Sequence, residues 1–311
     1  MADSNDPTVS ERRIVVGLGE VLWDELPGGW LLLGGAPANF AFMAAQLGDR
    51  GIVASRVGAD DSGREALRLL SERGLDTSDV QSDEAYLTGT VQVHLDAGGQ
   101  PRYLITENVA WDYLEWTPQW EELAKHADAV CFGTLAQRAP QARATIRQFL
   151  GATRDECVRI FDVNLRGSFY SAEILSESFD LAIVAKLNHE ELPIVADLLK
   201  LGGRGENAWA HRLIQVFDLE MVCVTRGARG SLMVTPSDLI EHSGHEVTVV
   251  DTVGSGDAFT AALVHHYLRH APLETIAEAA NRLGAWVASR TGGTPALDQS
   301  LRDEITGGKR D

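Results

Sequence analysis

The sequence predicts an α/β fold with a doubly wound, mostly parallel sheet and a β-hairpin outside that sheet. Beyond residue 120, short apolar runs that suit strands alternate with longer segments that suit helices. This alternation is the order of a parallel sheet whose strands are joined by crossover helices. Before residue 120, two runs with period-two alternation stand close together and predict a hairpin outside that pattern. The chain has 311 residues and 44% hydrophobic content, which is enough to bury one large core.

Composition limits the partners that the chain can have. Its formal net charge is −18, which disfavours nucleic acid and anionic membrane surfaces. No apolar run approaches the ~20 residues of a membrane-spanning helix. Residues 1–13 are polar and acidic, so we expect a flexible leader rather than a signal peptide, followed by one domain over residues 14–311.

The three cysteines indicate the redox compartment. Cys131, Cys157 and Cys223 are widely spaced, and two of them stand in strand-like runs. Such a sparse, odd set predicts buried thiols rather than disulfides or metal ligands. We therefore expect a cytoplasmic protein.

The N-terminal segment combines a buried strand with a polar turn. The first strand is expected at Ile14–Gly19, a short apolar run that ends in glycine. Gly34-Gly-Ala-Pro-Ala-Asn39 then leads into a helix over Phe40–Leu47. Two glycines before a helix let the backbone approach a ligand closely, and the side chains of Asp24 and Asn39 can each bind hydroxyl groups. A plain turn with solvent-facing polar residues is the alternative.

Two further features complete the N-terminal half. A second strand is expected at Ile52–Val57, and a helix follows it as far as Arg73. Thr88–Leu95 and Arg102–Ile105 then alternate apolar and polar residues on either side of Asp96-Ala-Gly-Gly99. That pattern predicts a hairpin with one apolar and one solvated face.

The C-terminal half supplies the repeated units of the large sheet. Strand-like apolar runs and helical segments follow one another in turn. The expected strands are Ala129–Phe132, Arg159–Asp162, Leu181–Leu187 and Met221–Thr225, and the expected helices lie near Ala139–Leu150, Glu190–Leu199 and Asn207–Phe217.

Polar residues follow each of these strands. In an open parallel sheet, ligands gather at the carboxyl ends of the strands. We therefore expect these side chains to converge on one crevice. They are Gln137, the run Asp162-Val-Asn-Leu-Arg166, Asn188 with Glu191, and Thr225-Arg-Gly227.

A glycine-rich turn near the C-terminus predicts a binding site for an anion. Val247–Val250 suits a strand, Asp251-Thr-Val-Gly-Ser-Gly-Asp257 makes a tight turn, and an alanine-rich helix begins near Asp257. This arrangement directs backbone N–H groups and a helix dipole at one point. A carboxylate there would repel a phosphate unless it takes a proton from an attacking hydroxyl. The alternative is that Asp257 caps the helix.

The complete motif resembles the C-terminal signature of the ribokinase-like (PfkB) sugar kinases. The resemblance runs from Ile14 to about Leu297 and implies a ribokinase-like fold with a small β-sheet lid, formed by residues of about 20–35 and 86–110. It makes Asp257 the catalytic base. It also implies that the amides of Gly254, Ser255 and Gly256 hold the γ-phosphate of ATP, with Arg166 adding to that stabilisation.

The N-terminal motifs correspond to the sugar-binding loop of the same family. Gly-Gly-x-x-x-Asn resembles the family's loop, which assigns Gly34, Gly35 and Asn39 to the sugar, and Asp24 is the best match to a further sugar-binding aspartate. Gln137 is a weaker candidate for the same role.

Nucleotide and metal sites are implied by the remaining motifs. The family's Asn-x-x-Glu matches Asn188 and Glu191, with Glu191 acting on Mg²⁺ through water; the same spacing is also that of a capping box. Thr225 and Gly227 resemble the nucleotide-binding turn, and Asn281 matches a position near adenine. Relatives with a K⁺ site use carbonyls that correspond here to Asp251, Val253 and residues 289–293.

Two other constellations are not expected to be sites. His265, His266 and His270 include a pair at helical i,i+4 spacing, but no glutamate stands between them, and we expect a solvated helix face. There is no Gly-x-x-x-x-Gly-Lys-Ser/Thr motif. The few lysines, Lys186 among them, offer no evident phosphate clamp, which leaves that role to backbone amides and arginine.

The sequence therefore predicts an ATP- and Mg²⁺-dependent sugar kinase with fructose as its acceptor. Ala36-Pro37 stands where ribokinase-type sequences usually carry a lysine, which favours the fructokinase type. Alternatives are a kinase of 2-keto-3-deoxygluconate, ribose or a nucleoside, or a non-catalytic sugar-binding regulator on the same fold. A regulator would be marked by the loss of Asp257 or of the glycine turn, and neither is lost. The resemblance also implies a homodimer formed through the lid.

Overall fold

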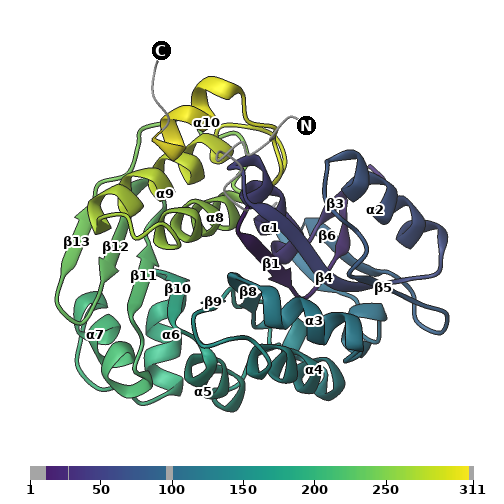
Figure 1. Ribbon diagram of the computed structural model, residues 1–311, viewed down its shortest axis with the longest axis horizontal. Coiled ribbons are helices and arrows are strands. Elements are labelled where there is room, and N and C mark those ends of the chain that lie inside the picture. Colours follow the sequence, from purple (N-terminus) through teal and green to yellow (C-terminus); the bar gives the residue numbers. More distant parts are fainter. Residues whose placement is uncertain (1–11, 27, 96–100, 308–311) are drawn as a thin grey trace, which may run out of the picture.

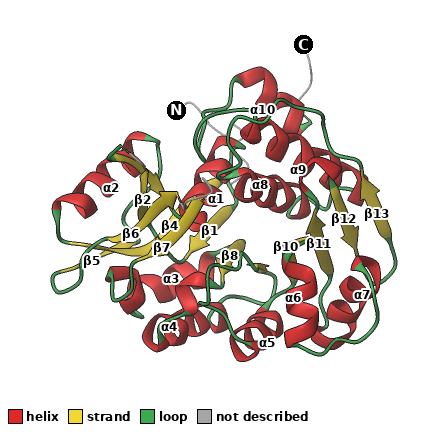
Figure 2. Ribbon diagram, turned by 180° about the vertical axis from the view of Figure 1, so that it is seen from behind, coloured by secondary structure: helices red, strands yellow, loops and turns green. Residues whose placement is uncertain are grey.

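The chain folds into three layers with a separate small sheet at one end (Figures 1 and 2). The computed structural model describes residues 12–26, 28–95 and 101–307. A nine-stranded sheet lies between two layers of helices, and a four-stranded sheet stands apart from it. This confirms the predicted doubly wound fold. The expected leader and the expected hairpin turn at residues 96–99 fall almost wholly outside the described residues.

The large sheet has the order β13-β12-β11-β10-β9-β8-β1-β4-β5. All its neighbouring pairs are parallel except β11–β12 and β12–β13. The chain moves one way from β1 to β4 and the other way from β1 to β8, so a topological switch point lies between β1 and β8. The strands are β1 (Ile14–Leu18), β4 (Arg50–Gly58), β5 (Val80–Asp83), β8 (Ala129–Gly133), β9 (Val158–Asp162), β10 (Val184–Asn188), β11 (Met221–Thr225), β12 (Ser231–Val234) and β13 (Leu239–His242).

Helices cover both faces of this sheet, which is why its strands are near-continuous apolar runs. Figure 1 shows one group above the sheet and the other below it. Each group packs its apolar side chains into its own core cluster. One face carries α3 (Pro118–His126), α4 (Pro140–Gly151), α5 (Ala172–Leu181), α6 (Glu191–Leu198) and α7 (Glu206–Phe217); the other carries α1 (Ala36–Gln46), α2 (Asp61–Glu72), α8 (Ser255–Tyr267), α9 (Leu273–Ala288) and α10 (Gln299–Thr306).

The small sheet contains the predicted hairpin. Its order is β3-β2-β6-β7, where β2 is antiparallel to β3 and parallel to β6, and β6 is antiparallel to β7. One face is buried through Leu22, Val91 and Ile105, and the register places Asp24 on that same face, opposite Val91. Trp30 and Leu104 are 73% and 59% exposed. The strands are β2 (Leu22–Leu26), β3 (Trp30–Gly34), β6 (Gly89–Leu95) and β7 (Pro101–Ile105).

Three expected elements differ from the structure. The strand expected at Leu181–Leu187 begins only at Val184, because α5 continues as far as Leu181. Helix α1 begins at Ala36 rather than Phe40, because Pro37 fits the first turn of a helix and Gly35 adopts a φ of 112° at the N-cap. The strand expected at Val247–Val250 does not form. These residues have no regular secondary structure, and the N–H of Val250 donates to the carbonyl of Ala288 at 2.9 Å. Apolar alternation marks an extended segment, but a strand also needs a neighbour with free backbone groups.

His265 and His266 on α8 are not on a solvated face, so that expectation is wrong for them, whereas His270 beyond the helix is exposed as expected. His265 and His266 are only 4% and 5% exposed. Nδ1 of His265 lies 2.7 Å from a carboxylate oxygen of Asp49, and Nε2 of His266 lies 2.7 Å from the carbonyl of Ile305. The reason is that α1 packs against one side of α8 and α9 against another, so little of the helix surface reaches solvent.

The three thiols are free and buried, as predicted. Among the described helices, none is long and apolar enough to cross a membrane.

Candidate active site

The anion site was predicted at the turn before α8, and the structure shows how that turn is built. Gly254 is the N-cap, with a φ of 75°, and a Cβ there would lie 2.4 Å from Gly293, so only glycine fits. The first intrahelical bond runs from Ala258 N–H to the Gly254 carbonyl (2.9 Å). The N–H groups of Gly256 and Asp257 precede that bond and therefore point out of the helix end, where the dipole favours an anion. The Ser255 N–H already donates to the Thr252 carbonyl at 3.2 Å.

Asp257 lies in the first turn of α8 but does not cap it. The N-cap is Gly254, and no side chain caps this helix. Instead, Nδ2 of Asn39 donates to Oδ2 of Asp257 at 2.8 Å and joins α1 to α8. Burial raises the pKa of Asp257 to about 6, with a further contribution from Asp162, and the hydrogen bond from Asn39 acts in the opposite direction. The capping alternative is therefore wrong for Asp257.

A buried lysine that was not expected to contact phosphate lies against this turn. Nζ of Lys186 is 3.0 and 3.1 Å from the two carboxylate oxygens of Asp162. A Cβ on Gly256 would come within 2.9 Å of the same Nζ. Burial works against the Lys186 charge, but the carboxylates of Asp162, Glu191 and Asp257 outweigh it and raise the pKa. The sequence signal for this site is a lysine within an apolar strand, because a lysine is rarely buried unless it is paired with an opposite charge.

A small pocket opens at the switch point between β1 and β8, next to Asp257. It contains Glu20, a second residue that the sequence analysis did not assign. Glu20 is 4% exposed, and burial raises the pKa of its carboxyl to about 7. The lining residues are Glu20, Ala36, Pro37, Phe40, Cys131, Phe132, Gly133, Asp162, Asn164 and Asp257.

The glycines of the predicted sugar-binding loop are required by close packing. A Cβ on Gly34 would lie 2.7 Å from Oδ2 of Asp24, and a Cβ on Gly35 would lie 2.4 Å from the carbonyl of Glu20. Burial raises the pKa of Asp24 to about 6, and Arg166 opposes that shift. The exposed guanidinium of Arg166 acts in the same way on Glu20 and Asp257. The positive charge of Arg166 therefore favours the ionised form of three carboxyl groups. They belong to Asp24 on β2, Glu20 just after β1 and Asp257 on α8.

Asn188 and Glu191 form the capping arrangement. Oδ1 of Asn188 accepts from the Glu191 N–H at 2.9 Å, and Oε2 of Glu191 accepts from the Asn188 N–H at 2.8 Å. Oε1 of Glu191 also accepts from the Leu165 N–H at 2.9 Å. Glu191 therefore ties the loop after β9 to the loop after β10. Each carboxylate oxygen keeps a lone pair, so contact with a metal through water remains compatible with this geometry.

Two nucleotide candidates meet across β12. Thr225 pairs with Ser231 in the β11–β12 register, and Nδ2 of Asn281 donates to Oγ of Ser231 at 2.7 Å. Nδ2 of Asn281 also donates to the Ala277 carbonyl at 2.8 Å. Gly227 follows with a φ of 59° in the short 3₁₀ turn η3 (Gly227–Arg229). The structure thus brings α9 against the start of β12, whose first residue pairs with the last residue of β11.

Gln137 lies apart from the other candidates. It ends the 3₁₀ turn η2 (Leu135–Gln137), and its side chain is buried. Nε2 donates to the Gly133 carbonyl at 2.8 Å and to Oγ of Ser178 on α5 at 2.9 Å. Gln137 does not line the pocket beside Asp257.

The two loops predicted to hold a monovalent cation lie side by side. Oδ1 of Asp251 accepts from the Val253 N–H, and Oδ2 accepts from the Gly292 N–H, both at 3.0 Å. The Asp251 carboxylate therefore joins residues 251–253 to residues 289–293.

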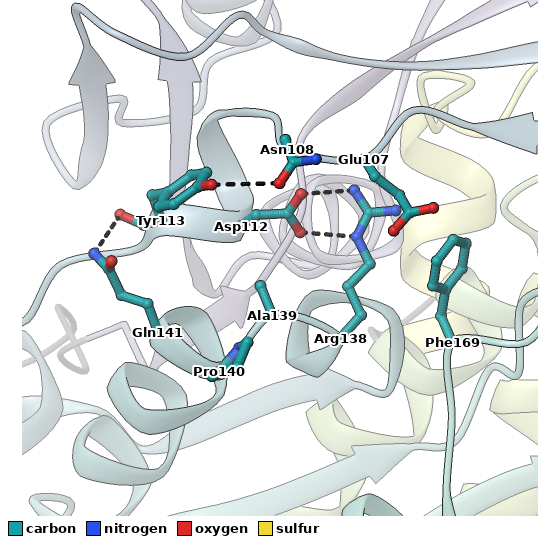
Figure 3. Close-up of a pocket in the computed structure, with 9 residues that line it drawn as sticks. All are labelled: Glu107, Asn108, Asp112, Tyr113, Arg138, Ala139, Pro140, Gln141 and Phe169. Carbon is teal, nitrogen blue, oxygen red and sulfur yellow. Dashed lines mark hydrogen bonds and ion pairs between the residues drawn. The ribbon is translucent and has the colours of Figure 1, made fainter.

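A larger pocket of about 280 Å³ lies beside the small sheet and contains none of the predicted site residues (Figure 3). Its floor is an ion pair between Arg138 and Asp112, with Nε to Oδ1 and Nη2 to Oδ2 both at 2.8 Å. The pocket is bounded by the 3₁₀ turn η1 (Ala110–Tyr113) and the start of α4. Its lining residues are Glu107, Asn108, Asp112, Tyr113, Arg138, Ala139, Pro140, Gln141 and Phe169.

Comparison with known proteins supports the same family as the motifs. A family model for pfkB family carbohydrate kinases matches residues 20–300. A fructokinase of Escherichia coli is 30% identical over 309 residues, which cover 92% of this chain and 97% of the relative. A putative sugar kinase of Pyrococcus horikoshii is 28% identical over 279 residues, which cover 86% of this chain and 85% of the relative.

Solved structures agree over nearly the whole chain. The crystal structure of the Pyrococcus horikoshii sugar kinase has a TM-score of 0.82 at 25% identity, and the match covers 95% of this chain and 99% of the other. A fructokinase from Vibrio cholerae with fructose, ADP and calcium bound has a TM-score of 0.78 at 25% identity, covering 94% and 98%. The chain belongs to the pfkB family of carbohydrate kinases.

Proposed function

We propose that this pfkB-family sugar kinase transfers the γ-phosphate of ATP to a hydroxyl group of fructose in the cytoplasm. The observation that carries the proposal is the position of Asp257. Its carboxylate is held by Asn39 at the amino end of α8, beside free N–H groups and the ammonium of Lys186. A base next to an anion site is what phosphoryl transfer to a hydroxyl requires.

Asp257 accepts the proton of the attacking hydroxyl. A pKa of about 6 leaves the carboxylate ionised at neutral pH, yet keeps it more basic than an ordinary aspartate. The hydrogen bond from Asn39 fixes one carboxylate oxygen, which leaves the other to face the substrate. Activity should therefore fall as the pH drops through about 6, because protonation removes the base.

The phosphoryl group is stabilised by fixed positive charge. Of the three amides expected at the anion site, that of Ser255 already donates to Thr252. The amides of Gly254 and Gly256 therefore bind the phosphoryl group, and Arg166 acts from the loop after β9. Lys186 adds a full charge against the same turn. Magnesium, when bound with ATP, would neutralise the phosphate oxygens, and Asn188 and Glu191 would hold it through water.

The sugar and the nucleotide occupy opposite sides of Asp257. Asp24, Gly34, Gly35 and Asn39 form the sugar side, with the small sheet as a lid. The Vibrio cholerae relative binds fructose and ADP, which supports fructose as the acceptor here.

Thr225, Gly227 and Asn281 form the nucleotide side, and residues 251–253 and 289–293 supply carbonyls for K⁺. A second copy of the chain would cover the exposed Trp30 and Leu104 of the lid.

Measurement of ADP production with a panel of sugars tests the proposal. Fructose should exceed ribose, adenosine and 2-keto-3-deoxygluconate in kcat/KM by at least ~10²-fold, because a site that binds specific hydroxyls rejects analogues that lack them. Asp24→Ala should abolish that preference, whereas Glu25→Ala on the same strand should retain it. If ribose or adenosine is preferred, fructose is the wrong acceptor; if no sugar is phosphorylated, the kinase proposal is wrong.

A further inference from the structure

One carboxylate oxygen in the pocket beside Asp257 is left without a partner. Oε2 of Glu20 is buried and makes no hydrogen bond to any described residue. A buried acceptor that has lost water and gained nothing is costly, so natural proteins rarely keep one without a reason. Glu20 follows β1 directly, at the switch point where sheets of this kind bind ligands.

The other acidic groups of this pocket are already engaged. Asp162 accepts from Lys186 and from Oγ1 of Thr260, and Asp257 accepts from Asn39. Much of the remaining wall is apolar, formed by Pro37, Phe40, Cys131 and Phe132. Glu20 therefore offers the pocket an acceptor that no described side chain uses.

A structural role explains only part of this arrangement. The backbone N–H of Glu20 itself stabilises the Glu20 carboxylate, as do the more distant charge of Arg166 and the backbone N–H of Ala36, the first residue of α1. Asp257 opposes it, since both groups carry negative charge when ionised. A residue needed only to hold α1 would not have to stand beside a second carboxylate with one oxygen unpaired.

We propose that Glu20 binds a second hydroxyl group of the acceptor, next to the hydroxyl that Asp257 deprotonates. The site then selects polyols that present two neighbouring hydroxyls, one to each carboxyl group. This inference rests on the proposed sugar kinase function and adds a contact that the family motifs did not assign. Binding supplies the donor that Oε2 of Glu20 lacks.

The test is a thermodynamic cycle that combines one substitution, Glu20→Gln, with the removal of one hydroxyl group from the sugar. Wild type and Glu20→Gln are assayed with fructose, or with whichever sugar the wild type uses best, and with its monodeoxy analogues. A hydrogen bond to a charged group is worth about 10- to 100-fold, so Glu20→Gln should lower kcat/KM for the complete sugar by that factor. For one analogue the same substitution should cost less than about threefold, because the hydroxyl that Glu20 binds is already missing.

Two variants separate this role from a structural one. Glu25→Gln, on β2 and outside the pocket, should lower the rates with all the sugars equally or not at all. Asp24→Asn should lower kcat/KM least for a different monodeoxy analogue, because Asp24 is expected to bind a different hydroxyl group. If Glu20→Gln does not fold, Glu20→Asp is taken through the same cycle, because it keeps the charge but withdraws the oxygens by one methylene.

Each outcome decides the proposal. Loss of discrimination at a single hydroxyl supports it. A uniform loss across all analogues, or a lower melting temperature with unchanged discrimination, assigns Glu20 to holding α1 and overturns it. Absence of turnover by the wild type with every sugar overturns the proposed function itself, and this inference with it.

Discussion

Two buried ion pairs in this molecule have nearly the same chemistry but different surroundings. The Lys186 and Asp162 side chains are 9% and 6% exposed, and those of Arg138 and Asp112 are 5% and 4% exposed. Replacing such a pair with apolar residues is often neutral for stability, so burial alone does not explain why either is kept.

The Lys186 pair faces a backbone turn. Its ammonium lies against Gly256, in the turn where the N–H groups of Gly256 and Asp257 point out of the helix end, and Asp162 also accepts from Thr260 on α8. The ion is therefore placed where an incoming anion would contact it.

The Arg138 pair faces aromatic rings and a carbonyl. The guanidinium lies 3.9 Å from the ring centre of Trp111 and 4.8 Å from that of Phe169. Its Nη2 also donates to the carbonyl of Thr106, just beyond β7, at 2.6 Å. This pair fastens the small sheet to the segment that follows β8.

The difference indicates that what a buried ion contacts beyond its partner decides its role. We expect the Lys186 pair, which lies against the turn before α8, to act in catalysis. We expect the Arg138 pair, which packs on two rings and forms the floor of the larger pocket, to hold two parts of the fold together. Activity should therefore depend on the first pair and stability on the second.

The largest effect is expected at Asp257, beside the Lys186 pair. Asp257→Asn removes the base but keeps the shape, so kcat should fall by ~10²- to 10⁴-fold while folding and ATP binding persist. Steady-state kinetics, a thermal melt and nucleotide titration check this. Near-normal turnover by the folded variant would remove Asp257 from the mechanism.

Arg138→Met should destabilise the chain by about 3–5 kcal/mol, because Asp112 is left as an unpaired buried charge. Urea unfolding measures the loss, and the double variant Arg138→Met/Asp112→Leu should recover much of it. The kcat of the folded variant should change little. A collapse of kcat with normal stability would make the two ion pairs alike and contradict the comparison.

Lys186→Met should lower kcat by about 10²- to 10³-fold, the usual effect of removing one group that stabilises the transition state. Because Asp162 then loses its partner, the matched variant is Lys186→Met/Asp162→Asn, which restores folding but not activity. Full activity in that double variant would show the Lys186 pair to be structural.

Glu191→Gln tests the metal role that its capping geometry leaves open. If Glu191 orders magnesium through water, the metal concentration needed for half-maximal rate should rise by about 10-fold, with a smaller change in sugar KM. Titration of MgCl₂ at fixed ATP measures this. If the variant has a lower melting temperature but an unchanged magnesium dependence, the role of Glu191 is limited to capping α6.

The smallest effect is expected from the loops joined by Asp251. Potassium should stimulate the rate modestly, because the carbonyls of residues 251–253 and 289–293 are held close together. Equal rates in potassium and in a bulky organic cation would exclude this site.

The sequence by itself determined the features that depend on neighbouring residues. The alternation of strands and helices, the glycine turn before Asp257 and the Asn188–Glu191 cap are all local, because hydrogen-bond ladders, φ > 0 positions and caps are set within a few residues. The carboxyl ends of parallel strands then had to share one edge, which explains why the predicted residues after β9, β10 and β11 converge.

Only the tertiary structure decided how distant residues meet. Asn39 and Asp257 are 218 positions apart, and no periodicity in the sequence pairs them. The burial of His265, the missing strand at Val247–Val250 and the positions of Lys186 and Glu20 all depend on which element covers which. The local sequence pattern determines the position of a side chain on its own helix or strand. Packing determines which residue of another element it contacts, and the chemistry of this site depends on those contacts.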